Sequence, residues 1–390
     1  MNQRPEKSFM YITPFLSEDQ RIIESANGSF IMPKNSGNGK LANLKELLGK
    51  GENVASTHQL FKYLDEECKD TILFSEYTLI LDECLDVIDR VNVKPSDLNL
   101  LIDRHLIEVG SDNYVHWVGE QDYDGVFEEI KNLSNNHQLL CIDKKFFIWQ
   151  YDPEVFKLFK DVYILTYMFK SSILSYYFDL WNIEYDIKSL RRESNRIELV
   201  DYYEPDLTSI KKLIHIYDGN LNSNFNQKET SLSKSWFHYA KNDEDIKQLK
   251  KNIKNIFMQI YKTKSEDFMW STAKESATKL NSKGFMYINT TKYPKKENNT
   301  FVACNARGTN KFSHKHYLVY AFNVYLPPEI KKYFDNQSNY TIKVNDDLFA
   351  LSTLVQWIWR SAIRNGEEIY IYLPSSRMRN LLISWLNNQL

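Results

Sequence analysis

Two adjacent carboxylates follow the apolar run in "LILDECLD", residues 79–86. The apolar residues before Asp82 and Glu83 predict a buried strand that ends at this pair. A carboxylate at the end of such a strand can coordinate Mg²⁺, usually through water. Its neighbour can then position a water that attacks the γ-phosphate of a nucleotide. The alternative interpretation is an ordinary acidic loop start, because a lone Asp-Glu pair is a weak signal.

A second candidate lies near the end of the chain, in "LVQWIWRSAIRNG", residues 354–366. On a helix with about 100° per residue, Thr353, Gln356, Arg360 and Arg364 share one face. The pattern predicts a helix that packs on a core and presents a Gln–Arg–Arg row to a partner. A solvated charged face is the alternative. The opposite, apolar face contains Leu351, Leu354, Val355, Ile358 and Ala362.

Further polar residues stand where other apolar runs end. Thr13 and Pro14 end the run 8–15, Thr57 and His58 end the run 53–58, and Thr166 follows the run that starts at 161. Polar residues at the carboxyl ends of strands that alternate with helices are typical of an open parallel α/β sheet.

The elements that must position these residues form two series. We expect strands at 8–15, 53–58, 77–89 and 161–169, then at 211–219, 284–290, 300–310, 317–325 and 367–376. A helix follows residue 39, and 92–158 is a mixed helical and hairpin insertion within the first series.

Composition restricts the function classes. A chain of 390 residues is too long for one compact core, so two domains are expected. The net charge of −2 provides no global field for nucleic acid, so any such binding needs a local basic patch. The four cysteines are too scattered for a zinc site or a disulfide framework, which favours a reducing cytoplasm. No segment resembles a signal peptide or a membrane span.

Taken in order, the motifs resemble those of superfamily 2 helicases, the DEAD/DEAH-box relatives, and more closely a helicase-like group encoded by phages of Gram-positive bacteria. The resemblance covers nearly the whole chain. The matching segments are "YITPFLSEDQRI" for motif Ia, "STHQLF" for Ib, "LDEC" for II, "LTYMF" for III, "CNARGTN" for V, "QWIWRSAIR" for VI, and "YIYLPSSRMRNLLISWL" for the C-terminal end.

The resemblance implies a role for each residue. Asp82 would be the Mg²⁺ ligand and Glu83 the base that orients water, while Gln356 and Arg360 would face the γ-phosphate of ATP, with Arg360 as an arginine finger. Arg364 would assist them. The implied nucleic-acid side, which contacts the phosphate backbone or links it to the nucleotide, consists of Thr13, Pro14, Thr57, His58, Thr166, Asn305, Arg307 and Thr309.

Two departures from the family pattern affect these roles. Trp359 stands where motif VI has a glycine, and Arg364 comes four residues after Arg360 instead of three. In addition, the sequence contains no G-x-x-x-x-G-K-[ST] loop to bind phosphates. "KNSGNGKL" (34–41) fails because Lys34 replaces the glycine and Leu41 replaces the Ser or Thr. We therefore expect a first domain without its first strand and phosphate loop, with unpaired sheet edges and weak ATP binding.

The resulting prediction is an α/β protein with two RecA-like parallel-sheet domains, 1–170 and 171–390. Its predicted function is a helicase-like protein of phage DNA metabolism that translocates on or unwinds DNA with ATP and Mg²⁺ if a phosphate loop is supplied. The alternative is a catalytically inactive remnant that acts as a DNA- or protein-binding regulatory module. The predicted partners are single-stranded or forked DNA and other phage replication proteins, in the cytoplasm of a bacterial host.

Other motifs receive plainer interpretations. His314 and His316 predict a basic loop and not a metal site, since no third ligand lies nearby in sequence. Trp357 and Trp359 predict core or interdomain packing, with base-stacking platforms as the alternative. Residues 294–299 predict a solvated turn. Arg377 and Arg379 either contact nucleic-acid phosphate or cap the last helix.

Overall fold

The computed structural model describes residues 7–26, 30–35, 37, 39–193, 196–223, 228–239, 241, 243–306 and 310–389. The chain forms two compact units. Unit 1 comprises Met1–Glu184 and Pro327–Val344, and unit 2 comprises Tyr185–Leu326 and Asn345–Leu390. The division differs from the sequence-based one at residue 170, because 171–184 and the later segment 327–344 belong to unit 1.

Unit 1 is built on a five-stranded parallel sheet with the order β10-β4-β1-β3-β2. All five residues of β1 are buried, as expected for a central strand that is covered on both faces. The strands are β1 (Phe9–Thr13), β2 (Phe30–Ile31), β3 (Asn53–Thr57), β4 (Thr78–Asp82) and β10 (Asp161–Leu165).

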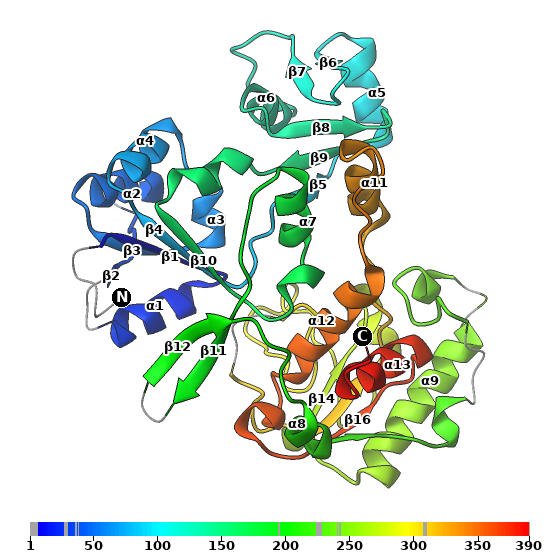
Figure 1. Ribbon diagram of the computed structural model, residues 1–390. Helices are drawn as coiled ribbons and strands as arrows, with labels where there is room; N and C mark the ends of the chain where they lie inside the picture. Colours follow the sequence, from blue (N-terminus) through cyan, green and yellow to red (C-terminus); the bar gives the residue numbers. More distant parts are fainter. Residues whose placement is uncertain are drawn as a thin grey trace. The chain divides into compact units, whose positions relative to one another are not determined.

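Helices cover the two faces of this sheet unequally (Figure 1). Helix α1 (Leu16–Ser25) packs against β1 and β3 on one face, where Tyr11 and Ile22 share a core cluster. The other face is covered by α2 (Gly39–Gly49), α3 (His58–Phe61) and α4 (Glu66–Phe74). Alternate residues of β1 therefore enter different cores.

The outer strand β10 corrects one prediction. We expected a buried strand over 161–169, but β10 ends at Leu165 and pairs only with β4 among the described strands. The side chains of Tyr163 and Leu165 are 43% and 48% exposed. The apolar residues of this segment are therefore not buried, because β10 is an edge strand of the sheet.

The interval between β4 and β10 contains a separate layer of hairpins and helices. β5 (Ile88–Val91), β9 (Phe146–Gln150) and β8 (Leu139–Ile142) form an antiparallel sheet, and β6 (Ile107–Val109) pairs with β7 (Val115–Trp117). α5 (Pro95–Asp103) and α6 (Glu128–Asn135) complete a core of their own. The segment predicted as one strand over 77–89 is thus two strands, β4 and β5, in different sheets.

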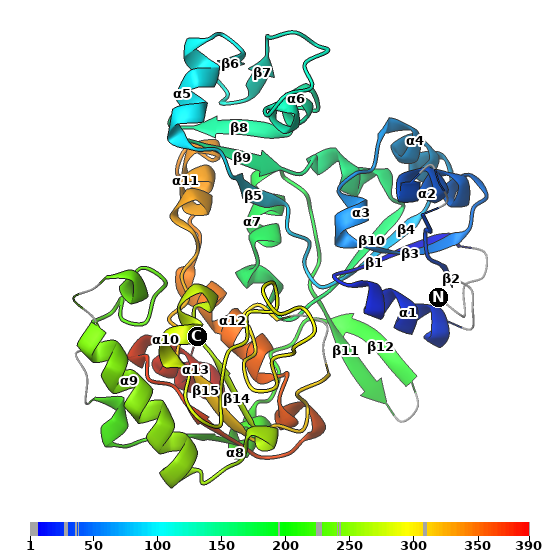
Figure 2. The ribbon, with the colours of Figure 1, turned by 180° about the vertical axis from the view of Figure 1, so that it is seen from behind.

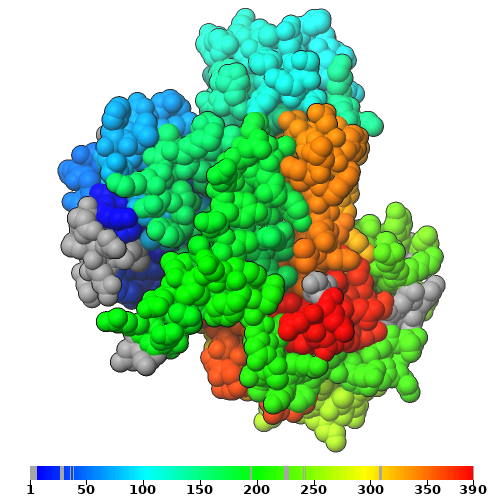
Figure 3. All heavy atoms as spheres, viewed as in Figure 1, coloured from blue at the N-terminus to red at the C-terminus, as the bar shows by residue number. Residues whose placement is uncertain are grey.

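A helix from late in the sequence packs on this layer. α11 (Pro328–Gln337) contacts β5, β8 and α7 (Ile173–Leu180). In Figure 3 the orange surface of α11 adjoins the cyan surface of this layer. The Tyr333 hydroxyl donates to Gln150 Oε1 at 2.6 Å in a buried position, and the rings of Tyr176 and Phe334 are 5.9 Å apart.

Unit 2 is built on a four-stranded parallel sheet with the order β13-β16-β15-β14 (Figure 2). α9 (Asp243–Asn255) packs on one face, and α12 (Asp346–Ile358) and α13 (Ser376–Leu386) belong to the other. The strands are β13 (Ile214–Ile216), β14 (Phe268–Ser271), β15 (Tyr317–Tyr320) and β16 (Ile369–Tyr372).

The remaining elements are short. A hairpin joins β11 (Lys188–Glu193) to β12 (Arg196–Asp201), and two further helices are α8 (Thr208–Leu213) and α10 (Ala277–Leu280). The helical turns are η1 (Pro153–Leu158), η2 (Phe169–Ser171), η3 (Asn220–Asn222), η4 (Trp236–His238), η6 (Ile256–Ile260), η7 (Ser265–Asp267), η8 (Lys274–Ser276) and η9 (Ala362–Asn365).

Two strand predictions in unit 2 are wrong, and one strand of its parallel sheet was not predicted. The described residues of 284–290 and 300–310 contain only isolated bridges, at Phe285 and at Phe301. Both phenylalanines pack on Trp270 of β14, the strand that was missed. Their apolar character thus reflects burial of loop residues under the sheet, which periodicity alone does not distinguish from a strand.

The predicted fold class is confirmed: the protein is α/β with two parallel sheets. Within the described part of the chain, no helix combines the length and apolar character needed to cross a membrane.

Candidate functional site

Four strands of unit 1 end at one level of the sheet. Thr13 lies opposite Thr57, and Asp82 lies opposite Leu165. Ile12 is paired with Leu81, so Thr13 and Asp82 occupy the next level together. The chain passes from β1 to β2 and β3 on one side, and then to β4 and β10 on the other. In open α/β sheets, ligands bind at such a reversal, outside the carboxyl ends of the strands.

Asp82 is the charged centre of this edge. Its Oδ2 lies 3.4 Å from an Nη of Arg21, and Arg21 Nε lies 2.7 Å from Oε2 of Glu18. Arg21 thus bridges two carboxylates, although its side chain is 51% exposed. Burial raises the pKa of the Asp82 carboxyl above its ordinary value, and the positive charge of Arg21 only partly opposes this.

Glu83 begins the loop beyond β4. Its backbone has φ +73°, an uncommon conformation for a residue with a side chain, and its N–H donates to the carbonyl oxygen of Leu165 at 3.1 Å. The backbone of Glu83 therefore joins the ends of β4 and β10 and turns the chain away from the sheet.

Thr13 lies inside the fold and not on its surface. The residue is fully buried, and its Oγ1 is 2.7 Å from Asp19 Oδ1 and 2.9 Å from the carbonyl oxygen of Phe15. It holds the turn between β1 and α1, with Pro14 between them, and is out of reach of a bound phosphate. Burial raises the pKa of Asp19 to about 6, the largest effect on that group.

The remaining predicted residues of unit 1 are at strand or helix ends. Thr57 caps α3, accepting a hydrogen bond from Leu60 N at 3.4 Å, and His58 is buried behind it. Thr166 follows the end of β10 and is partly exposed. Side chains at the ends of four parallel strands are thus gathered at one edge, but Thr13 and His58 serve the packing of that edge.

The donor set at this edge does not fit Mg²⁺ with ATP. Mg²⁺ requires near-octahedral oxygen ligands and usually shares them with the phosphates that it carries. Asp82 already carries a guanidinium partner, and in the part of the chain that is described no three His, Cys, Asp or Glu side chains could hold a metal ion. In the segment 34–41, Ser36 and Asn38 lie outside the described residues.

In unit 2, the expected Gln–Arg–Arg row does not lie on one helix. α12 begins with Asn345 as its cap and ends at Ile358. Ser361 is extended, and its Oγ donates to the carbonyl oxygen of Ile358 at 2.6 Å, which closes the last turn. Gln356 is therefore on the helix, Arg360 is in the turn after it, and Arg364 is in η9. The pattern failed because a helical wheel does not detect where a helix ends.

The structure brings together the segments that resemble motifs V and VI, at the amino end of the sheet. Arg364 donates to Asn310 Oδ1, and the N–H of Ala362 donates to the carbonyl oxygen of Lys315 at 3.0 Å. Asn305 lies in an exposed turn. The predicted residues Arg307 and Thr309 lie outside the described residues.

Two open alternatives are settled by contacts. Trp357 is fully buried and donates to the carbonyl oxygen of Val302 at 3.1 Å, which confirms core packing. Arg377 donates to Asn323 Oδ1 at 2.9 Å, to the carbonyl oxygen of Val324 at 2.7 Å, and to Asp347. Its guanidinium therefore pins α13 to the carboxyl end of β15, and has little capacity left for a phosphate.

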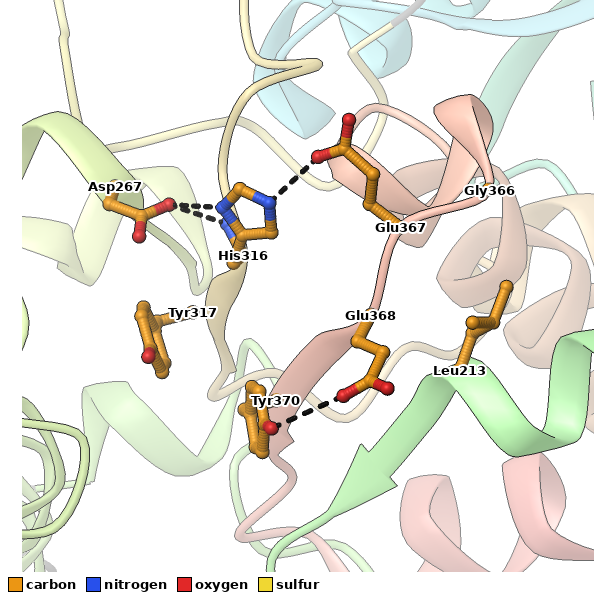
Figure 4. A pocket seen from close by; sticks show the side chains of 8 residues that line it. All are labelled: Leu213, Asp267, His316, Tyr317, Gly366, Glu367, Glu368 and Tyr370. Atoms are coloured by element: carbon orange, nitrogen blue, oxygen red, sulfur yellow. Dashed lines mark hydrogen bonds and ion pairs between the residues drawn. The ribbon is translucent and has the colours of Figure 1, made fainter.

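A shallow cavity of about 590 Å³ lies at the amino ends of the unit 2 strands (Figure 4). His316 stands between two carboxylates there, with Nδ1 2.7 Å from Asp267 and Nε2 2.8 Å from Glu367. Burial lowers the pKa of His316, but these two hydrogen bonds outweigh it and the net pKa is raised. The imidazole thus fastens the starts of β14, β15 and β16, a structural role.

Sequence reasoning missed the partners that determine these environments. Asp19 and Arg21 lie in the segment "YITPFLSEDQRI", but the motif pattern predicts no role for either of them. Asp267 and Glu367 lie outside every motif that the sequence suggested. The usable signal was position, because each of these carboxylates stands just before a strand or in the first turn of a helix.

Comparison with known proteins identifies relatives over the whole length. Residues 208–386 match the family described as YonV C-terminal Rossmann-like domain, and 88–149 match YonV middle domain. The chain is 37% identical over 408 aligned positions to the SPbeta prophage-derived uncharacterized protein YonV of Bacillus subtilis (strain 168), covering 100% of this chain and 94% of the relative.

Among solved structures, similarity is weaker. A chain titled XPD_Helicase matches with 13% identity and a TM-score of 0.44, covering 98% of this chain and 85% of that one. The structure of S. tokodaii Xpd4 matches with 11% identity and a TM-score of 0.44, covering 98% and 89%. Values this low support no conclusion about function.

Proposed function

The chain belongs to the YonV family, and from that premise we propose that it is a helicase-like nucleic-acid-binding protein of phage DNA metabolism. The Bacillus subtilis relative is described as prophage-derived, which supports a role in a phage. The proposed ligand is single-stranded or forked DNA, and the proposed protein partners are other phage replication proteins.

The observation that carries the proposal is the edge of the unit 1 sheet at which four parallel strands end at the same level. Thr57, Thr13 and Asp82 end adjacent strands there in the order that the helicase motifs require. These strand ends lie at the reversal of the strand sequence, the place where open α/β sheets bind their ligands. The contact of Arg364 with Asn310 supports it from unit 2, since the regions of motifs V and VI meet.

ATP-dependent movement is the conditional part of the proposal. In it, Asp82 and Glu83 would act on Mg²⁺ and water, and Gln356 and Arg360 would face the γ-phosphate, only if another chain supplied a phosphate loop. Because the donor set around Asp82 does not fit Mg²⁺ with ATP, we derive no catalytic step from this edge.

A second candidate is favoured by the ion pair of Arg21 with Asp82. A guanidinium 3.4 Å from the carboxylate replaces the charge that a metal would bring. This arrangement suits a catalytically inactive remnant that acts as a DNA- or protein-binding regulatory module.

Two measurements on the full chain separate these candidates. The first is the affinity for labelled single-stranded and forked DNA, and the second is ATP hydrolysis with and without that DNA, each beside Glu83→Gln and Arg360→Gln. DNA binding without hydrolysis, unchanged in Glu83→Gln, would show that the chain by itself is a DNA-binding protein and not a motor. DNA-stimulated hydrolysis that both variants abolish would support a motor. Absence of DNA binding by the native chain would contradict the nucleic-acid-binding proposal and leave only the protein-binding form of the regulatory module.

A further inference from the structure

The near-zero net charge of the chain conceals a strong asymmetry between its units. Unit 1 contains 21 Lys and Arg against 32 Asp and Glu, a net charge of −11. Unit 2 contains 28 against 19, a net charge of +9. Within unit 2, residues 262–315 hold 11 Lys and Arg against 4 Asp and Glu. This segment therefore carries the excess of positive charge that binding to nucleic acid requires.

Part of this segment is a long loop without helix or strand, drawn in yellow in Figure 2. Its outer part, residues 288–298, is closed at its base, because Ile288 N donates to Asn298 Oδ1 at 2.6 Å and Asn298 Nδ2 donates to the Ile288 carbonyl oxygen at 2.9 Å. We call this closed part the lysine–tyrosine loop. Long loops in compact domains that lack regular structure are commonly functional or disordered.

Hydrogen bonds inside the lysine–tyrosine loop give it a definite shape. Asn289 Oδ1 accepts from the N–H groups of Thr291 at 3.1 Å and Lys292 at 3.2 Å, and the N–H of Tyr293 donates to the Asn289 carbonyl oxygen at 2.9 Å. The N–H of Lys296 then donates to the Tyr293 carbonyl oxygen at 3.0 Å. The loop therefore holds its outermost residues in place.

Those outermost residues are an aromatic ring among lysines. The Tyr293 side chain is 47% exposed, and the ammonium groups of Lys292 and Lys296 lie 5.6 and 5.4 Å from its ring centroid. Lys295 is also exposed. The one nearby acidic residue in the loop, Glu297, is paired with Lys311. The three lysines thus provide positive charge around a flat apolar surface.

This combination matches one class of ligand. Single-stranded nucleic acid offers bases that stack on an exposed aromatic ring and phosphates that lysines neutralise. A purely solvated turn would need neither the exposed ring nor the closed base. We propose that the lysine–tyrosine loop is a binding site for single-stranded nucleic acid, with Tyr293 as the stacking platform and Lys292, Lys295 and Lys296 as phosphate contacts. This inference rests on the proposed function and adds a site outside its motif residues.

The test measures binding of the full chain to a fluorescent oligothymidylate of about 15 nucleotides by anisotropy over a range of salt concentrations. The loop variant is Lys292→Gln/Lys295→Gln/Lys296→Gln. The matched control is Lys247→Gln/Lys251→Gln/Lys254→Gln, which removes three exposed lysines from α9 in the same unit. Melting temperatures show whether each variant is folded.

The loop variant should bind about 10-fold or more weakly. Its slope of log Kd against log salt should fall by about 2, because each phosphate that a lysine no longer neutralises lowers the slope by roughly 0.7. The α9 control should change Kd by less than about 3-fold, since screened exposed charges outside the site contribute little. Tyr293→Ala should weaken binding about 5- to 100-fold, and Tyr293→Phe by less than about 2-fold, because stacking needs the ring and not the hydroxyl.

The results that would contradict the loop site differ from those that would contradict the proposed function. Equal effects of the two triple variants, or native affinity in Tyr293→Ala, would overturn the loop site while leaving the proposed function intact. Loss of binding to anionic phospholipid vesicles but not to the oligonucleotide would assign the loop to a membrane surface instead. No oligonucleotide binding by the native chain would overturn both the loop site and the proposed function.

Discussion

At the scale of single residues, the carboxyl edge of unit 1 combines groups with very different surroundings. Asp82 is partly exposed beside Arg21, whereas Asp19 is fully buried against Thr13. Both carboxyls lie in segments that resemble helicase motifs, but they differ in burial. Asp82 reaches the surface, whereas Asp19 supports the edge from inside the fold. A buried carboxyl with one hydrogen-bond donor favours its neutral form.

Asp19 leads to a prediction about pH. Its folded-state pKa of about 6 lies above the ordinary value near 4, so the folded state binds this proton more tightly than the unfolded chain. The stability that Asp19 contributes is therefore full below about pH 4 and is lost as the pH rises to about 6. Asp19→Asn should remove this pH dependence and unfold at a higher urea concentration than the native chain at pH 7.5.

The measurement is urea unfolding of unit 1 between pH 4 and 8. Glu24→Gln, which changes an exposed carboxyl on the same helix, is the control and should follow the native pH profile. An Asp19→Asn variant with the native pH profile would contradict the assigned pKa.

At the scale of elements, α11 shows how a late segment completes an early core. Tyr333 donates to Gln150 Oε1, and Gln150 Nε2 donates to the hydroxyl of Tyr114 at 2.5 Å, so one buried amide is satisfied from two elements. Surface ion pairs such as Arg90 with Glu329 add little to the stability of α11 on this core, because solvent and salt screen exposed charges. The buried tyrosine is thus an anchor of α11, together with the buried Ile330 and Phe334.

This anchor can be tested by truncation. Tyr333→Phe should lower the free energy of unfolding of unit 1 by about 1 kcal/mol, because Gln150 loses one partner in a buried position. Tyr333→Ala should lower it by about 3–5 kcal/mol, because removal of the ring leaves a cavity. Lys332→Gln, at the neighbouring exposed position, should have no measurable effect. Equal stability of the alanine variant and the native chain in chemical denaturation would show that α11 is not anchored here.

At the scale of the whole molecule, the chain has separate cores and a divided charge. The core of unit 2 gathers Phe268, Trp270 and Phe285, and unit 1 has its own clusters around Tyr11 and around Trp117. Units with separate cores can unfold independently, so a single unfolding free energy does not describe the chain.

We therefore expect two thermal transitions by calorimetry. Phe285→Ala removes a buried ring of unit 2 and should lower only one of them, by about 3–5 kcal/mol in free energy. Tyr333→Ala should lower only the other. One shared transition that both variants shift equally would contradict independent units.

The sequence by itself determined the local features of this protein. Apolar runs indicated β1, β3, β4, β15 and β16, because buried strands are rich in apolar residues. The order of Thr13, Thr57 and Asp82 followed from the order of those strands. The charge asymmetry is also present in the sequence, although it becomes visible only when the residues are divided between the two units.

Tertiary structure decided the rest, because it depends on which segments meet. β10 was expected to be buried but became an edge strand, and Phe285 and Phe301 are buried without forming strands. Arg21 reached Asp82 across 61 residues, and this pairing changes the chemistry expected from the motif. Local patterns encode which residues are buried, but long-range contacts determine against what they are buried and which charges they meet.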